Sequence, residues 1–116
     1  MLPFNYPIVA LSPLAGYTDL PFRKVVKKYD ADWTISEMIN GNALAFENDR
    51  TIKMLEKNSN ETPYSVQIAV NSPEVAKKAI EVINRYDFID GVDLNVGCPV
   101  KKAIKSGYGG NLLNEP

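Results

Sequence analysis

Four short runs of apolar, aromatic and β-branched residues recur along this chain at intervals of about 25–30 residues, the spacing of βαβ units. They lie near residues 8–12, 33–36, 64–70 and 91–96. Helical patterns separate them, and strands that alternate with helices form parallel sheets with right-handed crossovers. The sequence therefore predicts the α/β class. Two architectures meet this pattern: an open doubly wound sheet and part of a (β/α)8 TIM barrel.

Two of the intervening segments carry clear helix starts. Ser72-Pro73-Glu74 combines a capping hydroxyl, a proline at the first helical position and an acid near the positive end of the dipole, and predicts a helix to about Tyr86. Thr18 or Asp19 caps an earlier helix in the same way. Its apolar residues recur every 3.6 positions, so we expect them to form one apolar face of the helix. These residues are Phe22, Val25, Val26 and Tyr29.

Weaker helical patterns cover residues 43–57 and the segment 101–113, which glycines interrupt. The glycine-rich stretch 106–110 follows no predicted strand, has no G-x-G-x-x-G spacing and lacks the Lys-Ser/Thr of a phosphate-binding loop. We therefore interpret it as a flexible loop.

The last strand-like run ends in a sharp turn, Gly97-Cys98-Pro99, which holds the only cysteine of the chain. A lone cysteine is often a small buried hydrophobe. At a turn after a strand, however, a thiol can serve as a nucleophile, a redox sensor or a proton donor. The chain has no histidine, so proton donation stands on equal terms with nucleophilic attack.

Polar or turn-forming residues also occur at the ends of the other predicted strands, and in a (β/α)8 barrel these ends converge on one mouth. Asp93 and Asn95 share one side of their strand because side chains alternate, and Gln67 interrupts an apolar strand. These groups serve either hydrogen bonding within the fold or binding of a planar heterocycle. Residues 13–16 combine little side-chain bulk with backbone amides, which suits either a flat ligand or a plain turn.

Composition narrows the function classes further. The net charge is −1, which argues against a nucleic-acid binder that relies on bulk positive charge, although Lys101, Lys102 and Lys105 form a local basic cluster. One cysteine cannot form an internal disulfide and fits a reducing, cytoplasmic setting. Without histidine or a second cysteine, no zinc site is expected. No apolar run approaches the roughly 20 residues that span a bilayer, and the N-terminus lacks signal-peptide features.

With these motifs in view, the chain resembles the N-terminal half of the tRNA-dihydrouridine synthases. The resemblance departs mildly from the family pattern at Ser12, Leu14 and Gly110. Its segments keep the family's order and spacing across residues 12–113. They are Ser12-Pro13-Leu14-Ala15-Gly16-Tyr17-Thr18-Asp19, Ser36-Glu37-Met38, Val66-Gln67-Ile68, Asp93-Leu94-Asn95-Val96-Gly97-Cys98-Pro99 and Gly107-Tyr108-Gly109-Gly110-Asn111-Leu112-Leu113.

The resemblance implies a TIM barrel that binds FMN at its mouth and is followed by a small helical domain. Pro13, Leu14 and Ala15 would line the isoalloxazine, and Gln67 would hydrogen-bond to it. NADPH would be the source of electrons. Residues 1–116 would then cover about the first four βα units, a half-barrel whose remaining units and helical domain lie outside this chain.

For the reaction, the resemblance implies reduction of specific tRNA uridines to 5,6-dihydrouridine. A hydride from reduced FMN would reach C6 of the flipped-out uracil, and Cys98 would protonate C5. Asn95 would hold the target base, and Lys101 and Lys102 are assigned with it to substrate binding.

Further expectations concern this half-barrel by itself. We expect it to bind FMN weakly or not at all, to be inactive, and to self-associate through its open strand edges. Two alternatives to the leading interpretation remain: a related FMN barrel oxidoreductase that acts on a free pyrimidine, as dihydroorotate dehydrogenases do, and an inactive RNA-binding or structural fragment.

Overall fold

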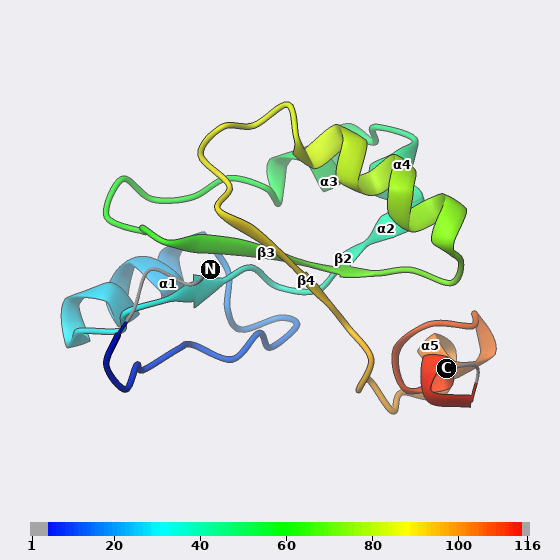
Figure 1. The fold of residues 1–116 in the computed structure, drawn as a ribbon, viewed down its shortest axis with the longest axis horizontal. Helices are drawn as coiled ribbons and strands as arrows, with labels where there is room; N and C mark the ends of the chain where they lie inside the picture. The colour runs from blue at the N-terminus through cyan, green and yellow to red at the C-terminus, as the bar shows by residue number, and fades with distance from the viewer. Residues whose placement is uncertain (1–4, 115–116) are drawn as a thin grey trace.

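A parallel sheet lies at the centre of the molecule, and strand β3 is its hub (Figure 1). The computed structural model describes residues 5–114. The strands are β1 (Thr34–Ile35), β2 (Ile39–Asn40), β3 (Tyr64–Ala69) and β4 (Gly91–Leu94), and β3 pairs in parallel with each of the others. The predicted α/β class with a parallel sheet is confirmed.

Strands β1 and β2 are two pieces of one interrupted strand. Residues of β3 that pair with them also pair with β4 on the opposite side, so β1 and β2 share one edge of β3. Ser36 lies in the gap, where its hydroxyl accepts a hydrogen bond of 3.0 Å from the backbone N–H of Gln67. This side-chain contact replaces a ladder hydrogen bond and keeps the two pieces in line.

The first predicted strand, residues 8–12, is not formed as a strand. The segment makes a single parallel bridge, between Ala10 and Trp33, beside β1. Three backbone hydrogen bonds accompany it, from Leu11 to Trp33 (2.9 Å), from Asp32 to Val9 (2.8 Å) and from Trp33 to Val9 (3.4 Å). Prolines 7 and 13 bound the run and cannot donate to a ladder, which limits its pairing. Four complete βα units are therefore not seen in the described residues.

The parallel segments are neighbours in the order of the chain. The bridge segment pairs with the residue before β1, the β1–β2 edge pairs with β3, and β3 pairs with β4. A doubly wound sheet reverses its strand order at a switch point, whereas a singly wound sheet does not. Over the described residues no such reversal occurs.

One face of the sheet carries the hydrophobic core. Helices α2 (Gly41–Ala45), α3 (Asp49–Lys53) and α4 (Pro73–Ile83) lie on this face, as Figure 1 shows. The start of α4 is as predicted, because Ser72 caps it with a hydrogen bond of 3.2 Å from the Val75 N–H. The core cluster consists of Ile39, Leu44, Leu55, Tyr64, Val66, Ile68, Val70, Ala79, Val82 and Ile83.

The apolar face of the first helix is largely exposed. Helix α1 (Leu20–Val26) is capped by Asp19, as expected, but Phe22 is 43% exposed and Val25 52%. The buried residue of α1 is Arg23, at 2% exposure. Periodicity shows which residues share a face of a helix, and here a buried charge decides which face turns inward.

Arg23 belongs to a buried ionic cluster at the amino ends of the strands. Its Nε donates to the Glu61 carboxylate over 2.8 Å, and its two terminal nitrogens donate to the Thr18 and Glu56 carbonyls over 2.9 and 2.7 Å. Glu61 also accepts from the Thr34 hydroxyl (2.7 Å) and from the backbone and side chain of Asn58 (2.7 and 2.8 Å). The cluster thus joins α1, β1 and the loop that leads into β3.

Hydrogen bonds and charge decide the ionisation of Glu61. Burial on its own would raise the pKa of this carboxyl, but hydrogen bonds from Asn58, Thr34 and Arg23, with the Arg23 charge, lower the pKa below its ordinary value of 4.5. A lowered pKa stabilises the fold above that ordinary value, and the contribution is lost as the pH falls through the folded-state value. Glu61 therefore adds to acid-induced unfolding.

The sheet remains open beyond β4. Among the described residues β4 pairs only with β3, and its residues Val92 and Leu94 are about half exposed. The described residues also contain no helix long and apolar enough to cross a membrane. The expected self-association through the open edge stays a prediction.

Replacing Arg23 by leucine tests the ionic cluster. The change leaves the Glu61 carboxylate buried without its cation, so we expect a loss of about 3–5 kcal/mol in the free energy of unfolding. Urea denaturation of the full-length protein measures it. As a control, Arg85→Leu breaks an exposed ion pair with Glu47 and should cost about 1 kcal/mol or less. Equal losses in the two variants would contradict the role of the buried cluster.

Candidate active site

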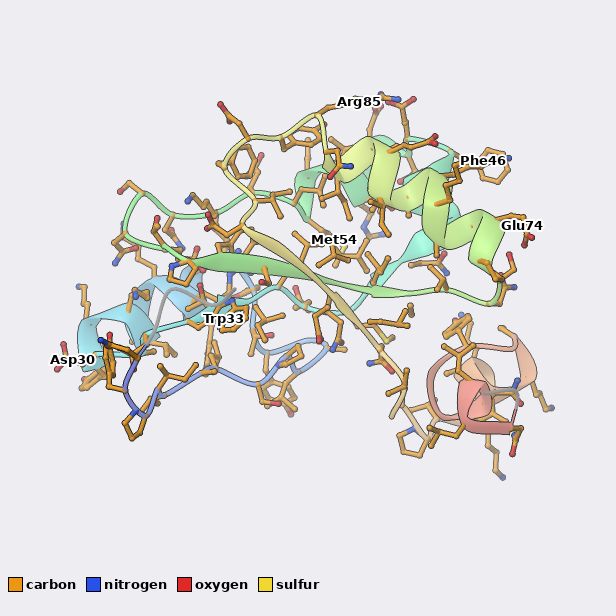
Figure 2. All side chains as sticks on the ribbon, viewed as in Figure 1. Asp30, Trp33, Phe46, Met54, Glu74 and Arg85 are labelled. Carbon is orange, nitrogen blue, oxygen red and sulfur yellow. The ribbon has the colours of Figure 1, made fainter. Side chains whose placement is uncertain are left out.

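A hollow of about 510 Å³ opens on the sheet face opposite α4, towards the carboxyl ends of the strands. On β3 the side chains of Val66 and Ile68 enter the core, so Gln67 between them points to the other face. Figure 2 shows Trp33 on that same side of the sheet, where its indole donates to the Ser65 hydroxyl over 3.0 Å. The hollow is lined by residues of several segments, including Ser12, Pro13, Ile35, Gln67, Asp93, Asn95 and Gly97.

Three polar side chains in this hollow form a continuous hydrogen-bonded chain. Gln67 and Asp93 are register partners on β3 and β4, and the Gln67 Nε2 donates to the Asp93 carboxylate over 2.6 Å. The Asn95 Nδ2 donates to the Gln67 Oε1 over 3.0 Å. The predicted placement of Asp93 and Asn95 on one side of their strand is therefore confirmed. In the described residues, every buried side-chain nitrogen and oxygen has a partner.

Asn95 extends this series of hydrogen bonds into the turn that contains Cys98. Its Oδ1 accepts from the backbone N–H groups of Gly97 (3.3 Å) and Cys98 (3.0 Å). An asparagine side chain that bonds to the backbone two or three residues on fixes a tight turn. The Cys98 side chain is half-buried and follows directly after the lining residue Gly97.

The glycine-rich stretch closes on Cys98 from the other side. Gly110 N–H donates to the Cys98 carbonyl over 3.1 Å. A methyl group on Gly109, whose φ is +66°, would lie 2.8 Å from that oxygen and 2.9 Å from the Cys98 Cβ. The interpretation of residues 106–110 as a flexible loop is wrong for Gly109 and Gly110, which begin the 3-10 helix η2 (Gly109–Asn114). Its glycines allow a close approach of two backbones.

The turn after the first predicted strand is held by Glu37, from the gap between β1 and β2. Glu37 accepts a hydrogen bond of 2.7 Å from the Gly16 N–H, and the Thr18 hydroxyl accepts one of 3.0 Å from the Leu14 N–H. Pro13 lines the hollow, whereas Leu14 and Ala15 lie on the exposed part of this turn, outside the lining. Glu37 has no local signal that pairs it with Gly16, because 21 residues separate them.

The predicted substrate-binding lysines lie further along the chain. Lys101 and Lys102 are exposed at the start of helix α5 (Lys101–Lys105), which follows the Cys98 turn. They do not line the hollow. Of the predicted site residues, Pro13, Gln67 and Asn95 thus share the hollow, and Cys98 stands beside it. Asp93 also lines the hollow, where it accepts a hydrogen bond from Gln67 within the fold, one of the two roles predicted for it. The contact of Gly109 with Cys98 was not predicted from the sequence.

The chemistry of this site is that of neutral amides, one carboxylate and one thiol. Carboxamides that offer both donors and acceptors suit a ligand with carbonyl and N–H groups in one plane. The thiol can give a proton but has no neighbouring histidine in this chain to activate it as a nucleophile. No cluster of three or more potential metal ligands occurs in the part of the chain that the structure describes.

Alanine substitutions at two glycines test whether η2 holds the Cys98 turn. Gly109→Ala adds both positive-φ strain and a clash with Cys98, so we expect a loss of about 2–4 kcal/mol in stability and faster alkylation of Cys98 by iodoacetamide. Gly107→Ala is the control, since its φ is +80° but its added methyl meets only Asn71 at 3.5 Å. Thermal unfolding and mass spectrometry of the full-length protein measure both effects. Equal alkylation rates in the two variants would contradict the contact.

This chain is similar in sequence to proteins of one known family. The family model described as dihydrouridine synthase matches residues 9–116. A probable tRNA-dihydrouridine synthase of Helicobacter pylori is 48% identical over 105 residues, which is 90% of this chain and 32% of that protein. A probable tRNA-dihydrouridine synthase of Treponema pallidum is 33% identical over 93% of this chain and 32% of its own length.

A relative from Saccharomyces cerevisiae, named tRNA-dihydrouridine(20a/20b) synthase [NAD(P)+], is 33% identical over 92% of this chain and 29% of its own length. The chain therefore spans about a third of the length of the relatives that it matches. The family match covers nearly the whole chain, including every segment that builds the hollow. The chain belongs to the dihydrouridine synthase family.

Proposed function

We propose that the full-length protein containing this chain reduces uridines in tRNA to 5,6-dihydrouridine. The relatives named above support this reaction class. The observation that carries the proposal is the chain of amides from Gln67 through Asn95 to the Cys98 turn. It joins groups that can bind a pyrimidine to a group that can give it a proton.

We further propose that residues 1–116 are the N-terminal part of an FMN-binding TIM barrel. Parallel strands that are neighbours in chain order, with polar side chains gathered near their carboxyl ends, support this architecture. The other half of the mouth, and a helical domain, would come from the remainder of the full-length protein. On this view the isolated chain lacks activity.

The residues around the hollow fit a flavin. The volume of the hollow, about 510 Å³, lies within the range of small-molecule sites, about 300–1,000 Å³. Beyond its contacts to Asp93 and Asn95, the Gln67 carboxamide keeps one N–H and one lone pair for a ligand. Pro13 would pack against the ring and Gln67 would bind its polar edge. Leu14 and Ala15, which follow on the exposed part of the same turn, would have to reach the ring from outside the present lining. When bound, FMN would supply the hydride, with NADPH as the source of electrons. The name of the yeast relative includes NAD(P)+, which supports a nicotinamide cofactor in general.

Cys98 and Asn95 act on the uracil in this proposal. Saturating the bond between C5 and C6 adds one hydride and one proton, and the Cys98 thiol gives the proton to C5. The Asn95 Nδ2 carries two hydrogens and uses one for Gln67, so one N–H is left. The Asn95 Oδ1 already accepts from the Gly97 and Cys98 amides. Asn95 can therefore donate to a carbonyl of the base and hold the ring beside the thiol.

Removing the thiol tests the reaction. Cys98→Ala in the full-length protein should lower the rate of dihydrouridine formation by about 10²–10⁴-fold, with tRNA binding retained, because only the proton donor is lost. Mass spectrometry of tRNA from a deletion strain that carries the variant measures the product. Cys98→Ser keeps the size of the side chain with a weaker acid and should also be slow. Dihydrouridine at the wild-type level with Cys98→Ala would refute the role, and activity on free uracil but not tRNA would favour the alternative oxidoreductase.

The exposed lysines at the start of α5 provide a test of RNA binding. We propose that Lys101 and Lys102 contact tRNA phosphates. Changing both to glutamine should weaken tRNA binding and lower the slope of log K against log salt concentration by about 2. Binding titrations at several salt concentrations measure this slope. The control pair Lys77→Gln/Lys78→Gln on α4, also exposed, should leave it unchanged. An unchanged slope for Lys101 and Lys102 would contradict the contact.

A further inference from the structure

We propose that Asp93 is a positioning residue for this reaction: it sets the direction of the hydrogen-bonded chain that orients Gln67, Asn95 and the Cys98 turn. The inference rests on the proposed function for its catalytic consequence. Its structural part stands on the contacts alone. Asp93 begins the chain by accepting from Gln67 (2.6 Å), and the chain ends at the backbone N–H of Cys98 (3.0 Å).

Each end of this hydrogen-bonded chain can act only as an acceptor or only as a donor. A carboxylate offers only acceptors, and a backbone N–H is only a donor. The two carboxamides between them must then be arranged in one way, with the Gln67 Nε2 towards Asp93 and the Asn95 Nδ2 towards Gln67. Both observed contacts follow this order.

The reverse arrangement would fail at both ends. If the Gln67 amide turned over, its oxygen would face the Asp93 carboxylate, and Asn95 would have to turn its nitrogen towards the Gly97 and Cys98 N–H groups. An unmade hydrogen bond at a buried group carries a large cost, and Gln67 is only 7% exposed. Asp93 thus supplies one of the two penalties that exclude the reversed state.

The neighbouring carboxylate on the same strand edge acts differently. Asp90 accepts a hydrogen bond of 2.8 Å from the backbone N–H of Tyr64, at the amino end of β3, and so joins the strands away from the hollow. Asp93 accepts from a side chain inside the hollow. Asp90 is therefore a matched control for a carboxylate that only holds β4 to β3.

The consequence for catalysis concerns the N–H that Asn95 has left for the substrate. In the observed direction Asn95 presents a donor to the base and keeps its oxygen for the Cys98 turn. In the reversed direction the turn would lose its acceptor and the base would meet a different face of the amide. Asp93 therefore acts through Gln67 and Asn95, without touching the base.

The first experiment compares amide hydrogen exchange in the full-length wild type, Asp93→Asn and Asp90→Asn. An asparagine at 93 can donate as well as accept, so the reversed state regains a partner. We expect the Gly97 and Cys98 amides to exchange about fivefold faster in Asp93→Asn, the effect of losing one hydrogen bond, and to keep the wild-type rate in Asp90→Asn. Unchanged exchange in Asp93→Asn, or the same acceleration in Asp90→Asn, would overturn the proposal.

A double variant separates direction from simple loss of a contact. In Asp93→Asn/Asn95→Asp the carboxylate moves to the other end of Gln67, so a fully paired chain forms in the reverse direction. The new carboxylate oxygens at position 95 still accept from the Gly97 and Cys98 amides, and the slow exchange of these amides should return. Activity should not return, because residue 95 no longer has a donor for the base. Failure of the double variant to restore slow exchange would refute the directional role, also if Asp93→Asn alone folds poorly.

Kinetics of the Asp93→Asn enzyme complete the test. We expect kcat to fall by about 10–100-fold, as for a slightly misplaced catalytic group. The KM for tRNA should stay within about twofold of the wild type, because the proposed RNA contacts, Lys101 and Lys102, lie outside the hollow. An unchanged kcat would overturn the catalytic part of the inference. If the wild-type enzyme itself forms no dihydrouridine, the proposed function fails, and the exchange data still decide whether Asp93 directs the chain.

Discussion

The buried pair of Arg23 and Glu61 is the constraint on which the rest of the structure depends. Charges that are removed from water must be paired and hydrogen-bonded, and this pair recruits partners from α1, β1 and the loop before β3 to satisfy both ions. The cluster lies where β1 and β3 begin. By fixing the amino ends of the strands with polar contacts, it sets the register with which the same strands reach the hollow at their other ends.

The two faces of strand β3 have different surroundings, an apolar core on one side and a polar hollow on the other. Val66 and Ile68 pack under α2 and α4 in the apolar core, and Gln67 between them reaches the polar hollow. This alternation is tolerated only because Asp93 and Asn95 stand beside Gln67 on β4 and just after it, where they satisfy its amide. The same contacts that satisfy the buried Gln67 amide also fix its orientation, so in the proposed reaction one set of hydrogen bonds would serve both stability and ligand binding.

Cys98 is held from two directions that are independent in the chain. Asn95 fixes its amide from the preceding strand, and Gly110 donates to its carbonyl from η2. Without these two contacts, the backbone of a turn that follows a strand can adopt several conformations. In the proposed reaction, this restraint on both sides of Cys98 would hold the proton donor close to a single carbon of the bound base.

Local rules of the sequence were sufficient for the α/β class, the start of α4 at Ser72, the common side of Asp93 and Asn95, and the family, because period, capping and motif order are properties of neighbouring residues. They failed where distant residues compete. The apolar side of α1 is exposed because Arg23 finds Glu61, 38 positions away, and no pattern within a helix reports such a partner. Residues 8–12 form a single bridge because the prolines at both ends of the run limit its pairing with the neighbouring strand. The closeness of Gly109 to Cys98, the clamp of Glu37 on Gly16 and the order of the amides around Asp93 were likewise decided only by tertiary structure, since each depends on two backbones meeting in space.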